Sequence, residues 1–210
     1  GSLYPEAVHV IVRGDSRAAS VAELAGRRIA VGQTGSASRA TALRILDAHG
    51  LRPDDIQLLD LPLNEALLGL RQQQVDAVIQ VIGVPADSIR DALTEVSLRL
   101  MPLSQRAIDT LTAPGTGLFA HTIPRGAYAT QRQDVRTVAT AALLLVAPDL
   151  AESEVRTITR YVFGGTRDFA ARGSAQGTLV SAANAHTGLS VPLHIAAAKA
   201  LDALAAPAGR

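Results

Sequence analysis

The sequence has no cysteine and no tryptophan, and aromatic residues make up only 3% of its 210 residues. Without cysteine the chain forms neither disulfides nor thiolate metal sites, and this composition fits an oxidising compartment, where a stray thiol is a liability. The 20 basic and 19 acidic residues leave a net charge of +1, which gives no reason to expect a nucleic acid or an anionic membrane as partner. No apolar run reaches the roughly 18 residues that span a bilayer.

Signatures of catalytic sites are missing as well. The five histidines show no pairing with an acid at the i, i+4 spacing that zinc sites use. Residues 32–38 lack the Gly-Lys-Ser/Thr ending of a phosphate-binding loop and do not spell Gly-x-Gly-x-x-Gly. Ser36 has no Gly-x-Ser-x-Gly context. We therefore expect a protein that is not an enzyme and that needs neither a metal nor a cofactor.

The chain does contain a regular alternation of strand and helix patterns. Strands are predicted at residues 8–13, 28–32, 57–61, 75–81 and 96–101, and helices at residues 20–25, 38–49, 64–73, 86–93 and 104–111. Ser20 and Glu23 give the first of these helices a possible capping box. Strands that are apolar on both faces and alternate with helices predict an α/β fold with a parallel sheet covered on each side.

The pattern loosens after residue 111. Residues 113–133 hold several prolines and glycines and are predicted to be a connecting segment. An apolar run follows at residues 135–146, then an amphipathic helix at 149–163 and an Ala-rich helix at 195–206. We expect the terminal region, including His194, to pack on its own lobe rather than in a ligand site. The side chains expected to be buried there are Phe163, Leu193, Leu201 and Leu204.

The strongest candidate for a binding site is the segment between the second strand and the second helix. Gly35, Ser36, Ala37 and Ser38 place two hydroxyls and free backbone N–H groups at a helix N-terminus, where unsatisfied donors and the helix dipole favour an anion. A carboxylate or phosphate is then held without a formal positive charge. The alternative is that Ser36 or Ser38 only caps the helix, since serine is a favoured N-cap in any protein.

A second group of candidates follows the strand at residues 75–81. Ligands of open α/β sheets bind outside the carboxyl ends of the strands, so Gln80 and Gly83 are expected to lie near the serine-rich segment. Gln80 is either a ligand contact or a hydrogen-bonded core residue. Asp76 stands at the other end of the strand and is interpreted as a turn or cap. Tyrosines are more often packing residues than ligand contacts, and Tyr128, in the Pro/Gly-rich connector, is the one most suited to contact a ligand.

Short motifs occur in a set order along the chain, at residues 3–6, 20–26, 29–32, 35–38, 76–77, 83–85, 123–128 and 191–194. This ordered set resembles a known family, the TAXI solute receptors of TRAP transporters. Two positions depart from the family pattern: Ala37 stands where glycine is usual, and Ile195-Ala196 stand where a Pro-Gly pair is usual.

The resemblance implies a two-lobed periplasmic binding protein of the second structural type, N-terminally incomplete. A complete α/β ligand-binding lobe is expected at residues 27–134, with residues 1–26 and 135–210 forming hinge strands and the remainder of an incomplete first lobe. The implied function is extracytoplasmic capture of a small organic anion, such as glutamate or a related carboxylate, for a transporter permease in the membrane. The alternative is a ligand-sensing domain of a membrane-anchored signalling or regulatory protein.

Overall fold

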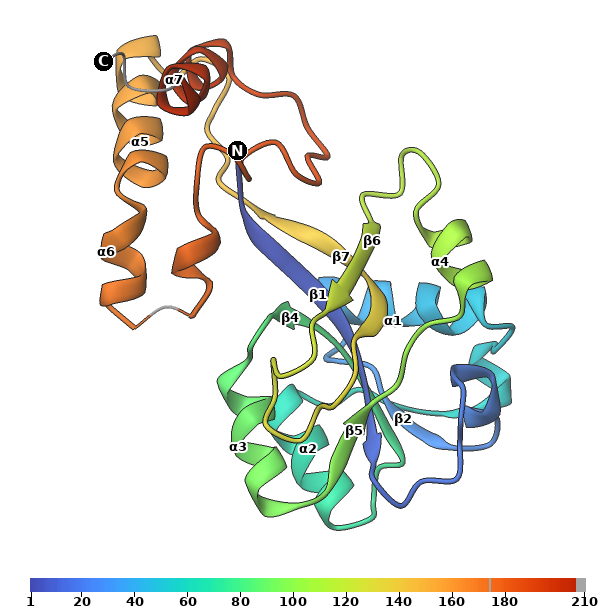
Figure 1. Ribbon diagram of the computed structural model, residues 1–210. Coiled ribbons are helices and arrows are strands. Elements are labelled where there is room, and N and C mark those ends of the chain that lie inside the picture. Colours follow the sequence, from blue (N-terminus) through green and yellow to red (C-terminus); the bar gives the residue numbers. More distant parts are fainter. Residues whose placement is uncertain (174, 207–210) are drawn as a thin grey trace. The chain divides into compact units, whose positions relative to one another are not determined.

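The computed structural model describes residues 1–173 and 175–206, without the side chains of residues 166–168. The chain divides into two compact units (Figure 1). Residues Ala7–Ala139 form one, which we call the sheet unit, and Gly1–Glu6 with Thr140–Arg210 form the other, which we call the helical unit. The assignment of residues 27–134 to a complete ligand-binding lobe stays a prediction.

The sheet unit contains most of the strands and four of the α-helices in the described part of the chain. The strands are β1 (Ser2–Arg13), β2 (Arg28–Ala30), β3 (Gln57–Leu59), β4 (Ala77–Gly83), β5 (Leu98–Leu100), β6 (Phe119–Ile123) and β7 (Val135–Leu143). The helices are α1 (Ala37–Ala48), α2 (Leu63–Arg71), α3 (Asp87–Glu95) and α4 (Gln105–Leu111), with 3₁₀ turns at Val21–Leu24 and Pro53–Asp55. The ends of β1 and β7 extend into the helical unit.

The strands form one mixed sheet in the order β3-β2-β4-β1-β7-β6, and β5 pairs with β1. β2 is parallel to both β3 and β4, whereas β1 with β5 and β6 with β7 are antiparallel pairs. The predicted α/β class is confirmed, but the prediction of a parallel sheet is wrong for these two pairs. Alternating strands and helices do not reveal strand direction, because each connection can return to either end of a neighbouring strand.

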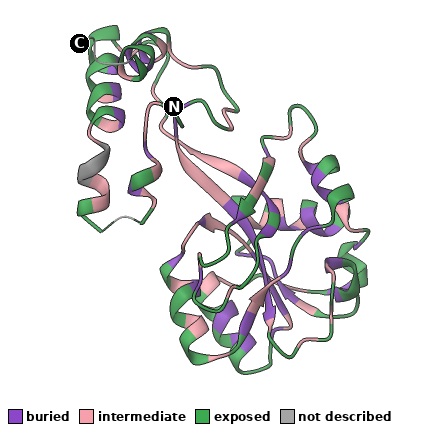
Figure 2. Ribbon diagram, viewed as in Figure 1, coloured by how far each residue is buried: buried purple, intermediate pink, exposed green. Residues whose placement is uncertain are grey.

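Helices cover both faces of the sheet (Figure 1). Successive strand residues point to opposite faces. Ile29 and Ile79 belong to the apolar cluster shared with α1 and α4, whereas their neighbours Ala30 and Val78 belong to the cluster shared with α2 and α3. This arrangement explains why the strands are apolar on both sides, and Figure 2 shows the buried residues concentrated along them.

Two local predictions differ from the structure. The helix expected at residues 20–25 is a single 3₁₀ turn at Val21–Leu24, and Ser20 makes no cap bond to its backbone. Instead, the Ser20 hydroxyl donates to the Glu23 carboxylate at 3.0 Å. The connecting segment contains an additional strand, β6, which pairs with β7. Several β6 side chains face solvent, so its sequence lacks the apolar pattern that identifies a buried strand.

The helical unit is built from α5 (Glu152–Gly164), α6 (Thr166–Ala171), a 3₁₀ turn at Ala175–Leu179 and α7 (Ile195–Ala205). Phe163 of α5 and Leu201 of α7 are buried together, and Leu193 and Leu204 pack partly buried against them. The predicted burial is therefore confirmed for Phe163 and Leu201, whereas Leu193 and Leu204 pack against them and are only partly buried. No helix within residues 1–173 and 175–206 has the length and apolar character needed to cross a membrane.

Candidate functional site

Three loops follow the parallel strands β2, β3 and β4. Because these strands run in the same direction, their carboxyl ends lie at one edge of the sheet. The loop after β2 leads into α1 and contains the predicted anion site, which we call the anion seat (residues 35–38). The loop after β3 begins at Asp60, and β4 itself ends at the buried Gly83. The fold therefore brings loops that are separate in sequence to the same edge of the sheet as the seat.

Ser36 is the N-cap of α1, and its hydroxyl oxygen accepts a hydrogen bond from the Arg39 N–H at 3.1 Å. The preceding Gly35 has φ of +82°, a left-handed conformation that glycine adopts without strain. The N–H groups of Ala37 and Ser38 open the helix and have no partner among the described residues. The cap interpretation of Ser36 is confirmed, and free donors remain beside it.

Ser38 joins the seat to β4. Its hydroxyl oxygen accepts from the Val81 N–H at 2.8 Å, and the Gln80 amide donates to the Val81 carbonyl at 3.2 Å. A hydroxyl that accepts a hydrogen bond still has its own proton to donate. Ser36 and Ser38 can therefore each donate to an anion while they hold their structural bonds. The structure brings Ser36, Ser38 and Gln80 into one region, and their contact with a ligand stays a prediction.

Asp60 is a feature of this region that the sequence interpretation missed. Arg39 Nε donates to Asp60 Oδ1 at 2.8 Å, and the Thr34 hydroxyl donates to the other carboxylate oxygen. These bonds, that from Arg39 first, hold the pKa of Asp60 below its usual value. The signal was available, because Asp60 directly follows a strand whose end lies at the ligand-binding edge. The region thus presents both a carboxylate and a guanidinium beside the free N–H groups.

Tyr128 lies in the core of the sheet unit. Its side chain is 1% exposed, and its hydroxyl lies 2.8 Å from His9 Nε2 and accepts from the Ala86 N–H at 3.1 Å. His9 Nδ1 contacts the Ala7 carbonyl at 3.0 Å, which accepts only, so Nδ1 carries the proton and Nε2 accepts from Tyr128. Burial lowers the pKa of His9 to about 4 and raises the pKa of Tyr128.

This network gives Tyr128 the structural role of a buried tyrosine with a hydrogen-bonded hydroxyl. Ala86 follows the loop after β4, so the Tyr128 hydroxyl fixes the start of α3. The prediction that Tyr128 also contacts a ligand is not tested by this geometry. Within the described residues, no group of three or more histidine, aspartate or glutamate side chains is placed to hold a metal ion.

A sequence profile described as the NMT1-like family matches residues 1–202. The chain belongs to the NMT1-like family. Membership of the TAXI receptors in particular stays a prediction.

Several solved structures of binding proteins are similar to this NMT1-like chain. The aliphatic sulphonate binding protein SsuA of Escherichia coli is 20% identical, with a TM-score of 0.49 over 96% of this chain and 55% of its own. The alkanesulfonate-binding SsuA of Xanthomonas axonopodis pv. citri, bound to MOPS, is 30% identical, with a TM-score of 0.39 over 50% of this chain and 36% of its own. An arginine transport system periplasmic binding protein of Legionella pneumophila is 19% identical, with a TM-score of 0.34 over 48% of this chain and 43% of its own. The chain therefore spans about half or less of the length of these proteins.

Proposed function

We propose that this chain belongs to an extracytoplasmic solute-binding protein that captures a small organic anion, of the amino acid or dicarboxylate type, for a TRAP-type transporter. The proposal gives the chain the general role that the names of the similar solved structures state, which is solute capture by a periplasmic binding protein. It assigns the chain binding rather than catalysis.

The observation that supports the proposal is the meeting of three strand ends around the N-terminus of α1. The free N–H groups of Ala37 and Ser38 and the hydroxyls of Ser36 and Ser38 supply donors for a carboxylate, and the helix dipole adds to their attraction. The bond from Ser38 to Val81 fixes the seat to the sheet, so the donors are held in place before a ligand arrives. Such preorganisation lowers the entropy that binding loses.

The charges beside the seat favour an amino acid over a dicarboxylate. The carboxylate of Asp60 lies next to the loop and is kept ionised by Arg39 and Thr34. An amino acid carries an ammonium group that can pair with this carboxylate while its own carboxylate occupies the donors. A dicarboxylate has no such group, and its second carboxylate would have to compete with Asp60 for the Arg39 guanidinium. We therefore propose an amino acid of the glutamate type as the solute.

A thermal-shift screen of the chain against amino acids, dicarboxylates and other organic anions tests the proposal, followed by calorimetric titration of each solute that stabilises it. We expect an acidic amino acid to raise the melting temperature. The Asp60→Asn variant should weaken binding of that amino acid and strengthen binding of succinate, because it removes the carboxylate and retains the side-chain shape. The proposal is contradicted if no small anion stabilises the chain, or if Asp60→Asn changes neither affinity.

A further inference from the structure

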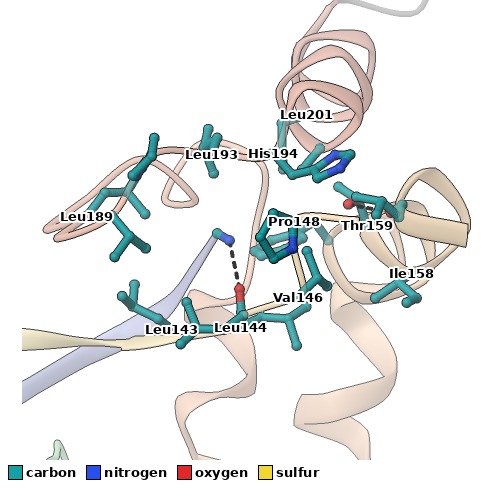
Figure 3. A pocket seen from close by; sticks show the side chains of 17 residues that line it. Leu143, Leu144, Val146, Pro148, Ile158, Thr159, Leu189, Leu193, His194 and Leu201 are labelled. Atoms are coloured by element: carbon teal, nitrogen blue, oxygen red, sulfur yellow. Dashed lines mark hydrogen bonds between the residues drawn. The ribbon is translucent and has the colours of Figure 1, made fainter. Parts of the chain in front are cut away.

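The helical unit contains a cavity that shares no residue with the anion seat. The cavity has a volume of about 440 Å³ and is bounded by the end of β7, by α5, by residues 189–194 and by α7 (Figure 3). This volume lies within the range of about 300 to 1,000 Å³ that is typical of pockets for small molecules. All of these segments belong to one compact unit.

Most of the cavity wall is aliphatic or aromatic. Representative wall residues are Leu143, Val146, Ile158, Phe163, Leu189 and Leu201. Two further wall residues are open to solvent, since Leu145 is 65% exposed and Val191 is 46% exposed. Large apolar side chains that are exposed together around a concave surface, rather than scattered singly, mark an interaction site. An apolar molecule in this cavity would remove both side chains from water.

The cavity wall has two polar side chains, which lie among apolar neighbours such as Leu201 and Ile158. They are His194 and Thr159, which lie opposite Leu143 and Leu189 (Figure 3). His194 Nδ1 lies 3.2 Å from the Ala196 N–H, which can only donate, so Nδ1 accepts and the neutral ring carries its proton on Nε2. Nε2 has no hydrogen-bond partner among the described residues. The Gly1 ammonium also lines the cavity and donates to the Leu144 carbonyl at 3.1 Å, and His194 Nε2–H is the side-chain donor without a partner beside the apolar wall.

We propose that this cavity binds a small amphiphilic carboxylate, with its apolar body against the leucine side and its carboxylate accepting from His194 Nε2–H. The site is separate from the anion seat and adds a second ligand class to the proposed function. Thr159 does not compete for the carboxylate, because its hydroxyl already donates to the Val155 carbonyl at 2.7 Å.

The distribution of polar groups favours a small molecule over a polypeptide segment. Each residue of an extended segment brings one N–H and one C=O that require partners when buried. The wall offers His194 as its unpaired side-chain donor, which matches a ligand with a single polar end. A fatty acid of medium length meets this requirement, because its remaining atoms are apolar.

Calorimetric titration of the full chain with sodium decanoate below its micelle concentration tests this proposal, with decyltrimethylammonium as the probe of opposite head-group charge. We expect one decanoate per chain, bound at least about tenfold more tightly than the cation, because only the carboxylate accepts from His194. The His194→Ser variant should remove most of this preference, since serine still caps α7 but lacks the Nε2–H donor. Exposed His186 is the matched control, and His186→Ser should leave both affinities unchanged.

A second variant tests the cavity itself. Ala197→Leu adds bulk to the wall and should weaken both probes at least about tenfold, whereas Leu68→Ser removes an exposed apolar side chain of the sheet unit and should change neither. Circular dichroism melts establish that each variant is folded. The proposal is overturned if decanoate shows no saturable binding. It is also overturned if the His194→Ser and Ala197→Leu variants each bind decanoate as tightly as the unchanged chain. A dimer in sedimentation that Val191→Ser dissociates assigns the apolar surface to a second copy of the chain instead.

Discussion

Replacing Ser36 with alanine separates the two roles that its hydroxyl can have. The hydroxyl oxygen caps α1 by accepting from the Arg39 N–H, and in the proposed function its proton is donated to an anion. Loss of an N-cap costs about 1 kcal/mol of folding stability, which lowers the melting temperature by about 2 to 4 °C for a chain of this size. Loss of a hydrogen bond to a charged acceptor costs about 1.5 to 3 kcal/mol of binding, which is about tenfold to a hundredfold in affinity.

The helix α4 supplies a matched control. Its N-cap is Ser104, whose hydroxyl oxygen accepts from the Ala107 N–H at 3.2 Å. Ser104→Ala removes a cap in the same unit without changing the anion seat. We expect Ser36→Ala and Ser104→Ala to lower the melting temperature similarly, and only Ser36→Ala to weaken ligand binding.

A third variant, Ser36→Asp, makes the test sharper. Aspartate is as good an N-cap as serine, so the melting temperature should stay near that of the unchanged chain. Its negative charge replaces the donated proton with a repulsive group, so anion binding should be abolished. The assays are thermal melts without ligand and calorimetric titration with the solute that the screen identifies. Unchanged affinity in both Ser36 variants would refute the anion seat and leave Ser36 with a structural role alone.

Three further predictions concern the ionisable groups of the sheet unit. Tyr128→Phe should lower stability by about 2 to 4 kcal/mol in chemical denaturation, because it leaves His9 Nε2 and the Ala86 N–H buried without a partner; unchanged solute affinity would then exclude Tyr128 as a ligand contact. The folded-state pKa of His9, about 4, lies below the ordinary histidine value of 6.5, so stability should fall by up to about 3 kcal/mol as pH falls from 6.5 to 4, where the unfolded chain binds the additional proton; the non-titrating His9→Gln variant should lose this part of the slope, and an identical slope contradicts the assignment. Asp76 has a lowered pKa, because its carboxylate accepts from the Arg28 guanidinium at 2.9 and 3.0 Å and from the Arg28 N–H at 2.9 Å. The folding stability that this ion pair contributes should be present above about pH 4 and lost as pH falls further. Asp76→Asn should remove this acid sensitivity, as measured in pH-dependent melts.

The sequence by itself determined the α/β class, most of the helices and strands, and the N-cap of α1 at Ser36. These properties are local, because burial on both faces imposes apolar runs of strand length and a helix start requires a cap such as Ser36. The interpretation of Asp76 as a turn or cap residue also rested on local sequence. In the structure, its carboxylate accepts from the backbone N–H of Arg28 at the start of β2. The strand β6 was not predicted, because its exposed side chains at a sheet edge carry no apolar pattern.

Only the tertiary structure decided which distant segments meet. The direction of β5 against β1, the bond of Ser38 to Val81 and the pairing of Arg39 with Asp60 depend on how the chain returns to the sheet. Tyr128 was selected as a candidate ligand contact for its place in a Pro/Gly-rich segment, yet its hydroxyl pairs with His9 at the other end of the sheet unit's sequence. The cavity beside His194 likewise arises from segments that carry no common motif. Such contacts are set by packing between non-local elements, and packing of this kind leaves no periodic trace in the sequence.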